Sequence, residues 1–352
     1  MRHTTKILDT TLRDGSYVVN FGFTAEQTAR IAAALDDAGI DMIEVGHGVG
    51  LNASKAGQGQ AAETDEAYMD AAGRNVQRGK WGMFAIPGIC NLSHLDACFD
   101  HSIGFLRFGV SIDSYERVLP FVEKAKSAGV ISCVNFMKSY TRDPLEFEQA
   151  ARKVVKEGAD YVYVVDSAGN MTPSRVRQYC ERILDLPVGF HAHNNLGLAV
   201  ANALIAEECG AQIIDCSLQG MGRCTGNTMT EHFVALMQRT GKLTHINLIT
   251  LLDTAEELVR PLLRQTGHDS VDLICGYAGF HSSYMDVIRR FAIEFDVDPR
   301  LLIIEVCKVT QSDAPDDLVR EKAKHIRAMS VDSGFRHRFP LQQYFGREQT
   351  NL

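Results

Sequence analysis

The feature of this sequence that most constrains its fold is a phrase repeated along the first 220 residues. A helical segment ends at a glycine, and a run rich in Val, Ile and Tyr follows at once, as in DDAGIDMIEVG, KSAGVISCVNF, KEGADYVYVVD and EECGAQIIDCS. Glycine just past a helix end readily adopts the left-handed C′ conformation. Apolar runs without polar alternation are typical of parallel strands that are buried on both faces. The repeat therefore predicts helices that alternate with parallel strands.

The segments between these repeats complete a set of eight expected strands. The strands are Ile7–Thr10, Met42–Val45, Trp81–Ile86, Phe105–Ser111, Ile131–Phe136, Tyr161–Asp166, Val188–His191 and Ile213–Ser217. Amphipathic segments lie between them, at Thr24–Asp37, Tyr115–Ser127, Pro144–Lys156 and Leu196–Cys209. Eight strands in alternation with helices predict an α/β fold, a (β/α)8 TIM barrel over residues 1–244, with a doubly wound parallel sheet as the alternative.

The alternation stops after the helix that follows Asn227. Beyond it, the pattern predicts helices at Leu248–Gln265, Tyr284–Phe295 and Pro299–Val309. A (β/α)8 barrel takes about 250 residues, and the 352-residue chain exceeds this length substantially. We therefore expect a C-terminal helical module at roughly 245–345, or else a decoration that covers one flank of the barrel.

Charge and cysteine content exclude several classes of protein. The chain has 36 Lys and Arg against 44 Asp and Glu, a net charge of -8, so no global positive field attracts nucleic acid or an anionic membrane. Nine cysteines without a C-x-x-C pair suit reduced thiols. The N-terminus lacks an apolar signal region, and no run of apolar residues is long enough to span a bilayer. We predict a cytoplasmic protein.

Two expected strand ends carry residues that could bind a metal. The active site of a (β/α)8 barrel lies at the C-terminal ends of its strands, where TTLRDGS places Arg13 and Asp14 and VGFHAHNN places His191 and His193. The two-residue spacing puts both imidazoles on one face of a strand. Two histidines and a carboxylate suit an octahedral divalent ion such as Mn²⁺, Mg²⁺ or Co²⁺. Histidines that only form hydrogen bonds, and an inert Arg13–Asp14 ion pair, are the alternatives.

Other strand ends suggest substrate contacts. Asp166 and Ser167 end the sixth strand, where they either contact substrate or cap a turn. The glycine-rich GMGRCTGNT after the eighth strand brings Asn227 toward the same mouth. The Gly/Ala/Gln-rich segment after the second strand is expected to form a lid, in which His47 either touches substrate or is only solvated.

These motifs together resemble a known family. DTTLRDGS, HAHNN and the G-x-G…GN loop are similar to the HMG-CoA lyase-like (DRE-TIM) metallolyase superfamily. Within it, EVGHGVGL, VVDSAG, FHAHNNLGLAVANAL, GNT and the late GYAGFHSS most resemble the 4-hydroxy-2-oxovalerate aldolases, over nearly the whole chain. The resemblance implies a class II aldolase that cleaves a 4-hydroxy-2-oxoacid to pyruvate and an aldehyde, in aromatic hydrocarbon catabolism.

The resemblance also implies roles for particular residues. Asp14, His191 and His193 would hold the metal, in the first place Mn²⁺; Arg13 would stabilise the enolate; and Ser167 would contact the carboxylate end of the substrate. Close members of the family pair the C-terminal module with an acylating aldehyde dehydrogenase. The resemblance thus implies such a partner, and we expect a homo- or hetero-oligomer.

One departure from the family pattern concerns the base. These aldolases usually carry a histidine directly after DGS, where this chain has Tyr17, and the position that matches a family tyrosine in the late motif is His281. We predict that the pair is exchanged, with His281 as the base and Tyr17 orienting or relaying. Unperturbed pKa values of about 6.5 for His and 10 for Tyr make His281 the better proton acceptor near neutral pH.

Three other functions remain open at this point. A Claisen-type enzyme of the same superfamily would condense an acyl-CoA with a 2-oxoacid. A metal-independent aldolase would use Lys138, after the fifth strand, to form a Schiff base. A catalytically silent subunit would only bind a partner through its helical tail.

Overall fold

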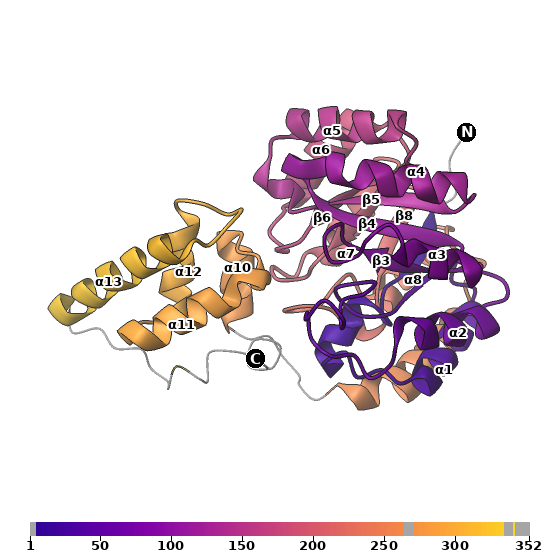
Figure 1. Ribbon diagram of the computed structural model, residues 1–352, viewed down its shortest axis with the longest axis horizontal. Helices are drawn as coiled ribbons and strands as arrows, with labels where there is room; N and C mark the ends of the chain where they lie inside the picture. The colour runs from indigo at the N-terminus through magenta and orange to yellow at the C-terminus, as the bar shows by residue number, and fades with distance from the viewer. Residues whose placement is uncertain (1–4, 264–269, 334–340, 342–352) are drawn as a thin grey trace.

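Eight parallel strands close into a barrel in which each strand pairs with the next along the chain and β8 pairs with β1 (Figure 1). The computed structural model describes residues 5–263, 270–333 and 341. The strands are β1 (Lys6–Asp9), β2 (Met42–Val45), β3 (Lys80–Ala85), β4 (Phe105–Ser111), β5 (Ile131–Met137), β6 (Tyr161–Asp166), β7 (Val188–Ala192) and β8 (Ile213–Cys216). The predicted (β/α)8 fold is confirmed, and the doubly wound sheet is excluded.

A helix follows each strand and covers the outside of the barrel (Figure 1). These helices are α1 (Ala25–Ala38), α2 (Asp65–Asn75), α3 (His94–Asp100), α4 (Leu119–Ser127), α5 (Pro144–Lys156), α6 (Pro173–Cys180), α7 (Ala199–Glu208) and α8 (Thr230–Arg239). Capping boxes begin two of them: Thr24 with Gln27 at α1, and Asp143 with Glu146 at α5. The helix predicted at Tyr115–Ser127 begins later, because residues 112–118 form 3₁₀ turns around the non-helical Ser114.

The interior of the barrel is not wholly apolar. Its apolar filling comes from Leu8, Met42, Phe105, Cys133, Tyr163, Val165 and Ile213. Among these side chains lies Arg107 of β4, which is fully buried together with Glu44 of β2 and Asp215 of β8. Buried charges are costly unless they are paired. Here Arg107 forms ion pairs with both carboxylates.

The first helices after the barrel pack against it. Helix α9 (Leu248–Thr254) continues into a π-helical turn (Ala255–Val259) and a 3₁₀ turn (Arg260–Leu262). Its buried residues Leu251, Ala255 and Val259 belong to the large core between strands and helices, and α9 contacts α1. The expected helix Leu248–Gln265 is therefore broken into three short pieces, and Gln265 lies outside the described residues.

A second lobe with its own core contains the remaining helices (Figure 1). They are α10 (Ser270–Ala278), α11 (Met285–Phe295), α12 (Pro299–Cys307) and α13 (Asp316–Ser333). Among the described residues, the core of this lobe starts at Val271. The module bounds of roughly 245–345 stay a prediction, and residue 345 falls outside the described residues. Helix α13 is highly charged, and among its residues 316–329 it buries the narrow stripe Val319, Ala323 and Ile326.

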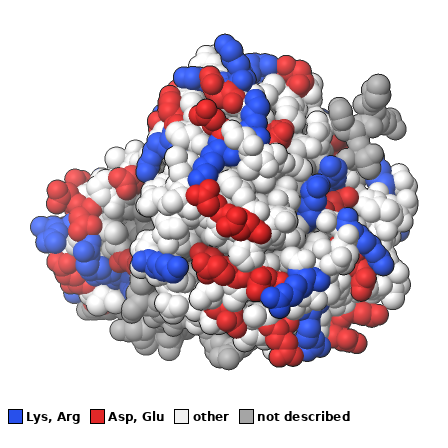
Figure 2. Space-filling view, turned by 45° about the vertical axis from the view of Figure 1, so that its right-hand side comes forward, with Lys and Arg blue, Asp and Glu red and all other residues white. Residues whose placement is uncertain are grey.

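The surface and the thiols agree with the composition. Acidic and basic side chains are interspersed on the face shown in Figure 2, and all nine cysteines are free thiols. No helix in the part of the chain that the structure describes is long and apolar enough to cross a membrane.

Candidate active site

Three predicted ligands meet at the mouth of the barrel. Asp14 begins a 3₁₀ helix (Asp14–Val19) after β1, His191 lies in β7, and His193 follows that strand directly. All three are buried, and one ligand atom from each lies within 4.8 Å of the other two. The turn after Asp14 packs closely on the loop after β8 at Gly15. A Cβ on Gly15 would lie 2.9 Å from the Cβ of Met221, so this contact requires glycine.

Hydrogen bonds hold the side chains of His191 and Asp14 in place. Nδ1 of His191 lies 2.9 Å from Oδ2 of Asp215. The carboxylate of Asp14 accepts hydrogen bonds from Nη1 of Arg13 and from Nδ2 of Asn227, both at 2.7 Å. Burial opposes ionisation of Asp14, but the charge of Arg13, together with the neighbouring His193 and His191 rings and the Asn227 hydrogen bond, outweighs burial and holds its pKa well below the usual range. Asp14 is therefore an anion.

The donor set fits a divalent ion. Burial lowers the pKa of His193 to about 4, so its ring is neutral. Nδ1 of His193 is buried, and no residue in the described ranges gives it a hydrogen-bond partner. A neutral imidazole with an unpartnered nitrogen, a second imidazole oriented by a carboxylate, and an anionic carboxylate are the arrangement that metal sites use.

A chain of buried ion pairs connects this group to the barrel interior. Nε of Arg13 donates to Glu44 at 2.6 Å, Nη1 of Arg107 donates to the same carboxylate at 2.9 Å, and Nη2 of Arg107 donates to Asp215. Asp215 in turn holds His191. Arg107 thus connects Arg13 to the predicted metal ligand His191 through the two carboxylates. Sequence reasoning missed this network, although its signal was a charged residue inside an otherwise apolar strand: MIEV, FLRFGVS and IIDC.

The group faces a cavity of about 300 Å³. Its floor includes Arg13, Asp14, His191 and His193, and Ser167 and Tyr17 also line it. Apolar walls come from barrel strands and loops, and His281 and Ser283 close the cavity from the C-terminal module. The remaining lining residues are Gly48, Val49, Gln58, Phe84, Ile86, Ile89, Asn135, Met137, Lys138, Val165 and Arg223.

Both residues of the predicted exchange line this cavity. Tyr17 packs edge-on against Phe21, with ring centroids 5.1 Å apart, and the guanidinium carbon of Arg223 lies 4.6 Å from the centroid of the Tyr17 ring. His281 caps a 3₁₀ turn (Ser282–Tyr284), so Nδ1 lies 3.1 Å from the backbone N of Ser283 and 2.7 Å from its Oγ. Burial, and then the positive charges of Arg223 and Lys138, keep the pKa of His281 well below its usual value.

Three of the predicted substrate-binding residues do not line the cavity. Asp166 accepts hydrogen bonds from the backbone N–H groups of residues 170 and 171, as the turn-capping alternative expected. His47 accepts from the Val49 N–H at Nδ1, lies 3.1 Å from the Gly59 carbonyl at Nε2, and stacks on a phenylalanine. The side-chain amide of Asn227 donates a hydrogen bond to the carboxylate of Asp14. These side chains hold loops in place, and a sequence pattern cannot distinguish a capping side chain from one that faces a cavity.

The loop that carries Asn227 depends on a glycine. Gly226 has a φ of +86°, and a Cβ at this position would lie 1.9 Å from the carbonyl oxygen of Gly220. The backbone N–H of Asn227 donates to that same carbonyl at 2.9 Å. The tight turn places the Asn227 amide against Asp14.

Lys138 follows β5 in the left-handed conformation, with φ of 59°. Its Nζ donates to the hydroxyl of Tyr284, lies 3.3 Å from the carbonyl of Ser312, and sits 4.4 Å from the centroid of the Tyr284 ring. Lys138 therefore joins the barrel to the helical module at the edge of the cavity.

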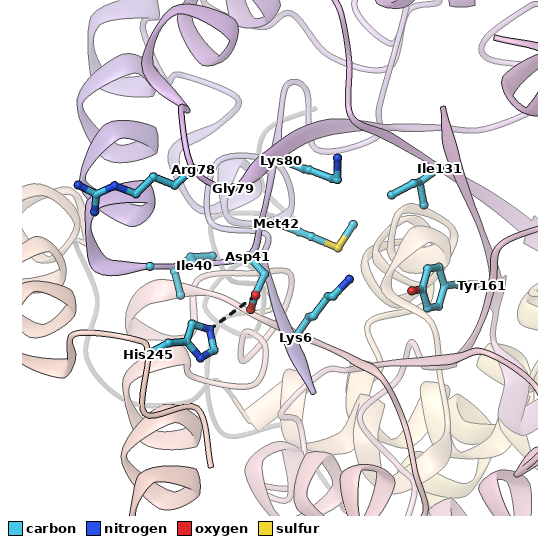
Figure 3. A pocket seen from close by; sticks show the side chains of 11 residues that line it. Lys6, Ile40, Asp41, Met42, Arg78, Gly79, Lys80, Ile131, Tyr161 and His245 are labelled. Carbon is cyan, nitrogen blue, oxygen red and sulfur yellow. Dashed lines mark ion pairs between the residues drawn. The ribbon is translucent and has the colours of Figure 1, made fainter. Parts of the chain in front are cut away.

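A second cavity of about 350 Å³ lies at the opposite end of the barrel (Figure 3). First residues of strands line it, among them Lys6, Met42, Lys80, Ile131 and Tyr161, and an ion pair joins His245 to Asp41 at 3.6 Å. The Asp14, His191 and His193 group is the one potential metal-binding cluster found within the described residues. The chemistry therefore belongs to the C-terminal ends of the strands.

Comparisons with known proteins show the family to which the chain belongs. The HMGL-like family model matches residues 4–259. The chain is 38% identical to 4-hydroxy-2-oxovalerate aldolase 2 of Nocardia farcinica, over 94% of this chain and 96% of the relative. It is 39% identical to an oxaloacetate decarboxylase of Mycobacterium tuberculosis, over 81% and 86%. The HMG-CoA lyase structure from Brucella melitensis shares the fold, with a TM-score of 0.62 at 18% identity, over 75% of this chain and 100% of the other. The chain belongs to the HMGL-like family.

Proposed function

We propose that the protein is a divalent-metal-dependent, class II aldolase that cleaves a 4-hydroxy-2-oxoacid to pyruvate and an aldehyde. The observation that carries the proposal is the buried group of Asp14, His191 and His193 beside Arg13 on the floor of one cavity. The likeness to 4-hydroxy-2-oxovalerate aldolases over most of the chain supports this reaction.

Asp14, His191 and His193 would hold the metal, and we propose Mn²⁺, with Mg²⁺ or Co²⁺ as alternatives. The ion, when bound, supplies Lewis-acid polarisation of the 2-oxo group. The protein keeps two of the three ligands in their binding forms: Asp14 ionised by its neighbours and His193 neutral by burial.

Arg13 is positioned to stabilise the developing enolate. Two of its nitrogens are held by Glu44 and Asp14, while no described residue accepts a hydrogen bond from Nη2. The guanidinium lies on the ring of Phe84, 4.6 Å from its centroid, and faces the cavity. When the C3–C4 bond breaks, its electron pair moves to form the enolate, and a fixed donor at such an oxyanion is worth about 3–4 kcal/mol.

Ser167 would contact the substrate carboxylate. Its Oγ accepts the backbone N–H of Lys138 at 2.9 Å, which leaves the hydroxyl proton to donate into the cavity. Asn227, Asp166 and His47, predicted as substrate contacts, would act indirectly by holding Asp14 and the loops around the cavity.

The C4 hydroxyl proton must pass to a base in the cleavage direction. We propose His281 for this role, with Tyr17 orienting or relaying. The backbone N–H of Ser283 donates to Nδ1 of His281, so the neutral ring carries its proton on Nε2 and Nδ1 holds the lone pair. Ser283 thereby controls which nitrogen of His281 can accept the proton.

The relatives do not favour the other functions considered from the sequence. The relatives reported above are named as aldolases and an oxaloacetate decarboxylase, which does not favour a Claisen-type condensation or a silent subunit. For a Schiff-base aldolase, Nζ of Lys138 would have to leave Tyr284 and Ser312. Aromatic catabolism, a dehydrogenase partner bound through the helical module, an oligomer and a cytoplasmic location stay predictions.

The test is pyruvate release from 4-hydroxy-2-oxopentanoate after chelator treatment. We expect activity to vanish without metal and to return with Mn²⁺ in the original protein. Asp14→Asn should not recover, while the exposed control Asp70→Asn should. Activity that resists chelation would contradict the proposal, and borohydride trapping of a substrate on Lys138 would then identify the Schiff-base mechanism.

A further inference from the structure

The cavity has two chemically different ends. The floor holds the metal-binding group, Arg13 and Ser167, which under the proposed function engage the 2-oxoacid end of the substrate. Three further lining residues, called the rim here, come from outside the strands: Lys138 after β5, Arg223 in the loop after β8, and His281 of the helical module. An aldehyde-forming end that extends from the metal-binding group toward the helical module would approach these rim residues.

Lys138 is a cation without a contacting anion among the described residues. The partners of its Nζ are a tyrosine hydroxyl and a backbone carbonyl, and no described carboxylate lies within 4.0 Å of it. Asp313 and Asp113 act on it only at longer range. The left-handed backbone of Lys138 is a conformation that a lysine rarely adopts, and such residues concentrate at functional sites.

Arg223 brings a second positive charge to the same rim. Its guanidinium lies over Tyr17, and it lines both this cavity and an adjoining cleft of about 450 Å³ that shares Tyr17 and Ser283. Next to burial, Arg223 and Lys138 are the largest causes of the lowered pKa of His281. The positive potentials of both side chains therefore converge at the His281 ring.

From this arrangement we infer that the natural substrate carries a second anionic group, a carboxylate or a phosphate, at the end that leaves as the aldehyde. The inference rests on the proposed aldolase function and specifies its substrate class. A neutral alkyl end gains no charge-assisted hydrogen bond from Lys138 or Arg223, whereas an anionic oxygen does. The cavity volume lies at the lower end of the range for small-molecule sites, which suits a short substrate with an acid group at each end.

The first experiment compares aldehydes of matched length in the addition to pyruvate with Mn²⁺. Succinic semialdehyde is compared with butanal, and glyceraldehyde 3-phosphate with glyceraldehyde. We expect kcat/KM for one charged aldehyde to exceed that of its neutral partner by about tenfold or more, mainly through KM. The pair that shows the preference identifies the anion as carboxylate or phosphate.

The effect of each variant is measured as the ratio of kcat/KM for the charged aldehyde to kcat/KM for its neutral partner. Lys138→Met and Arg223→Met should each lower this ratio about tenfold, and Lys138→Arg should recover part of it. Lys156→Met is the matched control, because Lys156 is exposed on α5 on the outside of the barrel. Its ratio should equal that of the original protein.

A binding measurement supplies a readout that is independent of turnover. Calorimetric titration of the chelator-treated protein with glutarate and with pentanoate compares ligands of five carbons that differ by one carboxylate. Glutarate should bind more tightly, by about tenfold, and Lys138→Met should remove the difference.

The outcomes separate the two proposals. Aldol addition that favours neutral aldehydes, or a ratio that Lys138→Met and Arg223→Met leave unchanged, would overturn the second anionic group and leave the aldolase function intact. No addition with any of the four aldehydes would overturn the proposed function and this inference with it.

Discussion

Nδ1 of His191 lies 2.9 Å from Oδ2 of Asp215, on the neighbouring strand of the barrel. Because a carboxylate only accepts hydrogen bonds, this contact places the proton of the neutral imidazole on Nδ1 and leaves Nε2 with a lone pair. A carboxylate behind a metal-binding histidine fixes the ring orientation and raises its basicity. Asp215 itself is held by Arg107, so the ligand is oriented from the interior of the barrel.

Replacing Asp215 should weaken metal binding. In Asp215→Asn the neutral amide no longer favours Nδ1–H of His191, and we expect affinity for Mn²⁺ to fall about 10–100-fold in calorimetric titration of the chelator-treated protein. Asp160→Asn is the control, since Asp160 precedes β6 at the other end of the barrel and accepts the backbone N–H of Ser132 at 2.8 Å. Unchanged affinity in a folded Asp215→Asn protein would contradict the orienting role.

Removing Arg107 should destabilise the fold. Arg107→Met leaves the carboxylates of Glu44 and Asp215 in a buried interior without the cation between them, and breaking such a pair costs about 3–5 kcal/mol. Urea unfolding should show this loss in the free energy of unfolding. In contrast, Arg152→Met removes exposed ion pairs with Glu148 and Asp185 and should cost no more than about 1 kcal/mol. Equal midpoints for the two variants would argue against a structural role of the network.

Two reactions distinguish the loss of the base from the loss of the residues that stabilise the enolate. Decarboxylation of oxaloacetate gives the same enolate but removes no proton from a C4 hydroxyl. His281→Ala should therefore lower aldol cleavage about 10²–10⁴-fold, and lower decarboxylation much less. Tyr17→Phe and Ser283→Ala should show smaller losses in the same direction. The exchange would be wrong if His281→Ala kept near-normal cleavage while Tyr17→Phe abolished it.

The pH profile should respond to the charge of Lys138. In the proposed mechanism the base is the neutral form of His281, so activity should be lost as pH falls through the pKa of this residue. Burial, Arg223 and Lys138 depress this pKa below about 6.5, which extends activity toward acid. Lys138→Met removes one depressing charge, so the acid limb of kcat/KM should move to higher pH, while Lys156→Met should leave it in place. A limb that stays in place or moves to lower pH in Lys138→Met would contradict the assignment of the base.

The barrel was predictable because its signals are local. At four places a glycine after a helix and a Val/Ile-rich run after the glycine define a unit within a dozen residues. The expected strands agree with the observed ones to within one residue at each end. The module was harder to predict. Helix α13 buries only a narrow apolar stripe among its described residues, which gives a weak pattern in the sequence. The sequence of α9 does not indicate that this helix packs on α1 rather than on the helices that follow it.

By itself, the sequence determined the barrel and the residue types at its strand ends, since strand period and strand order place Asp14, His191 and His193 at one mouth. Only the tertiary structure decided what these residues contact. The ion pairs Arg13–Glu44, Glu44–Arg107 and Arg107–Asp215 join residues 31, 63 and 108 positions apart. The two pairs of Arg107 form only when the barrel closes, because closure excludes water and brings side chains of the non-adjacent strands β2, β4 and β8 together. The direction in which a strand-end side chain points depends on the loop that follows it, which is why Asp166 and His47 hold loops while Lys138 and Arg223 face the cavity.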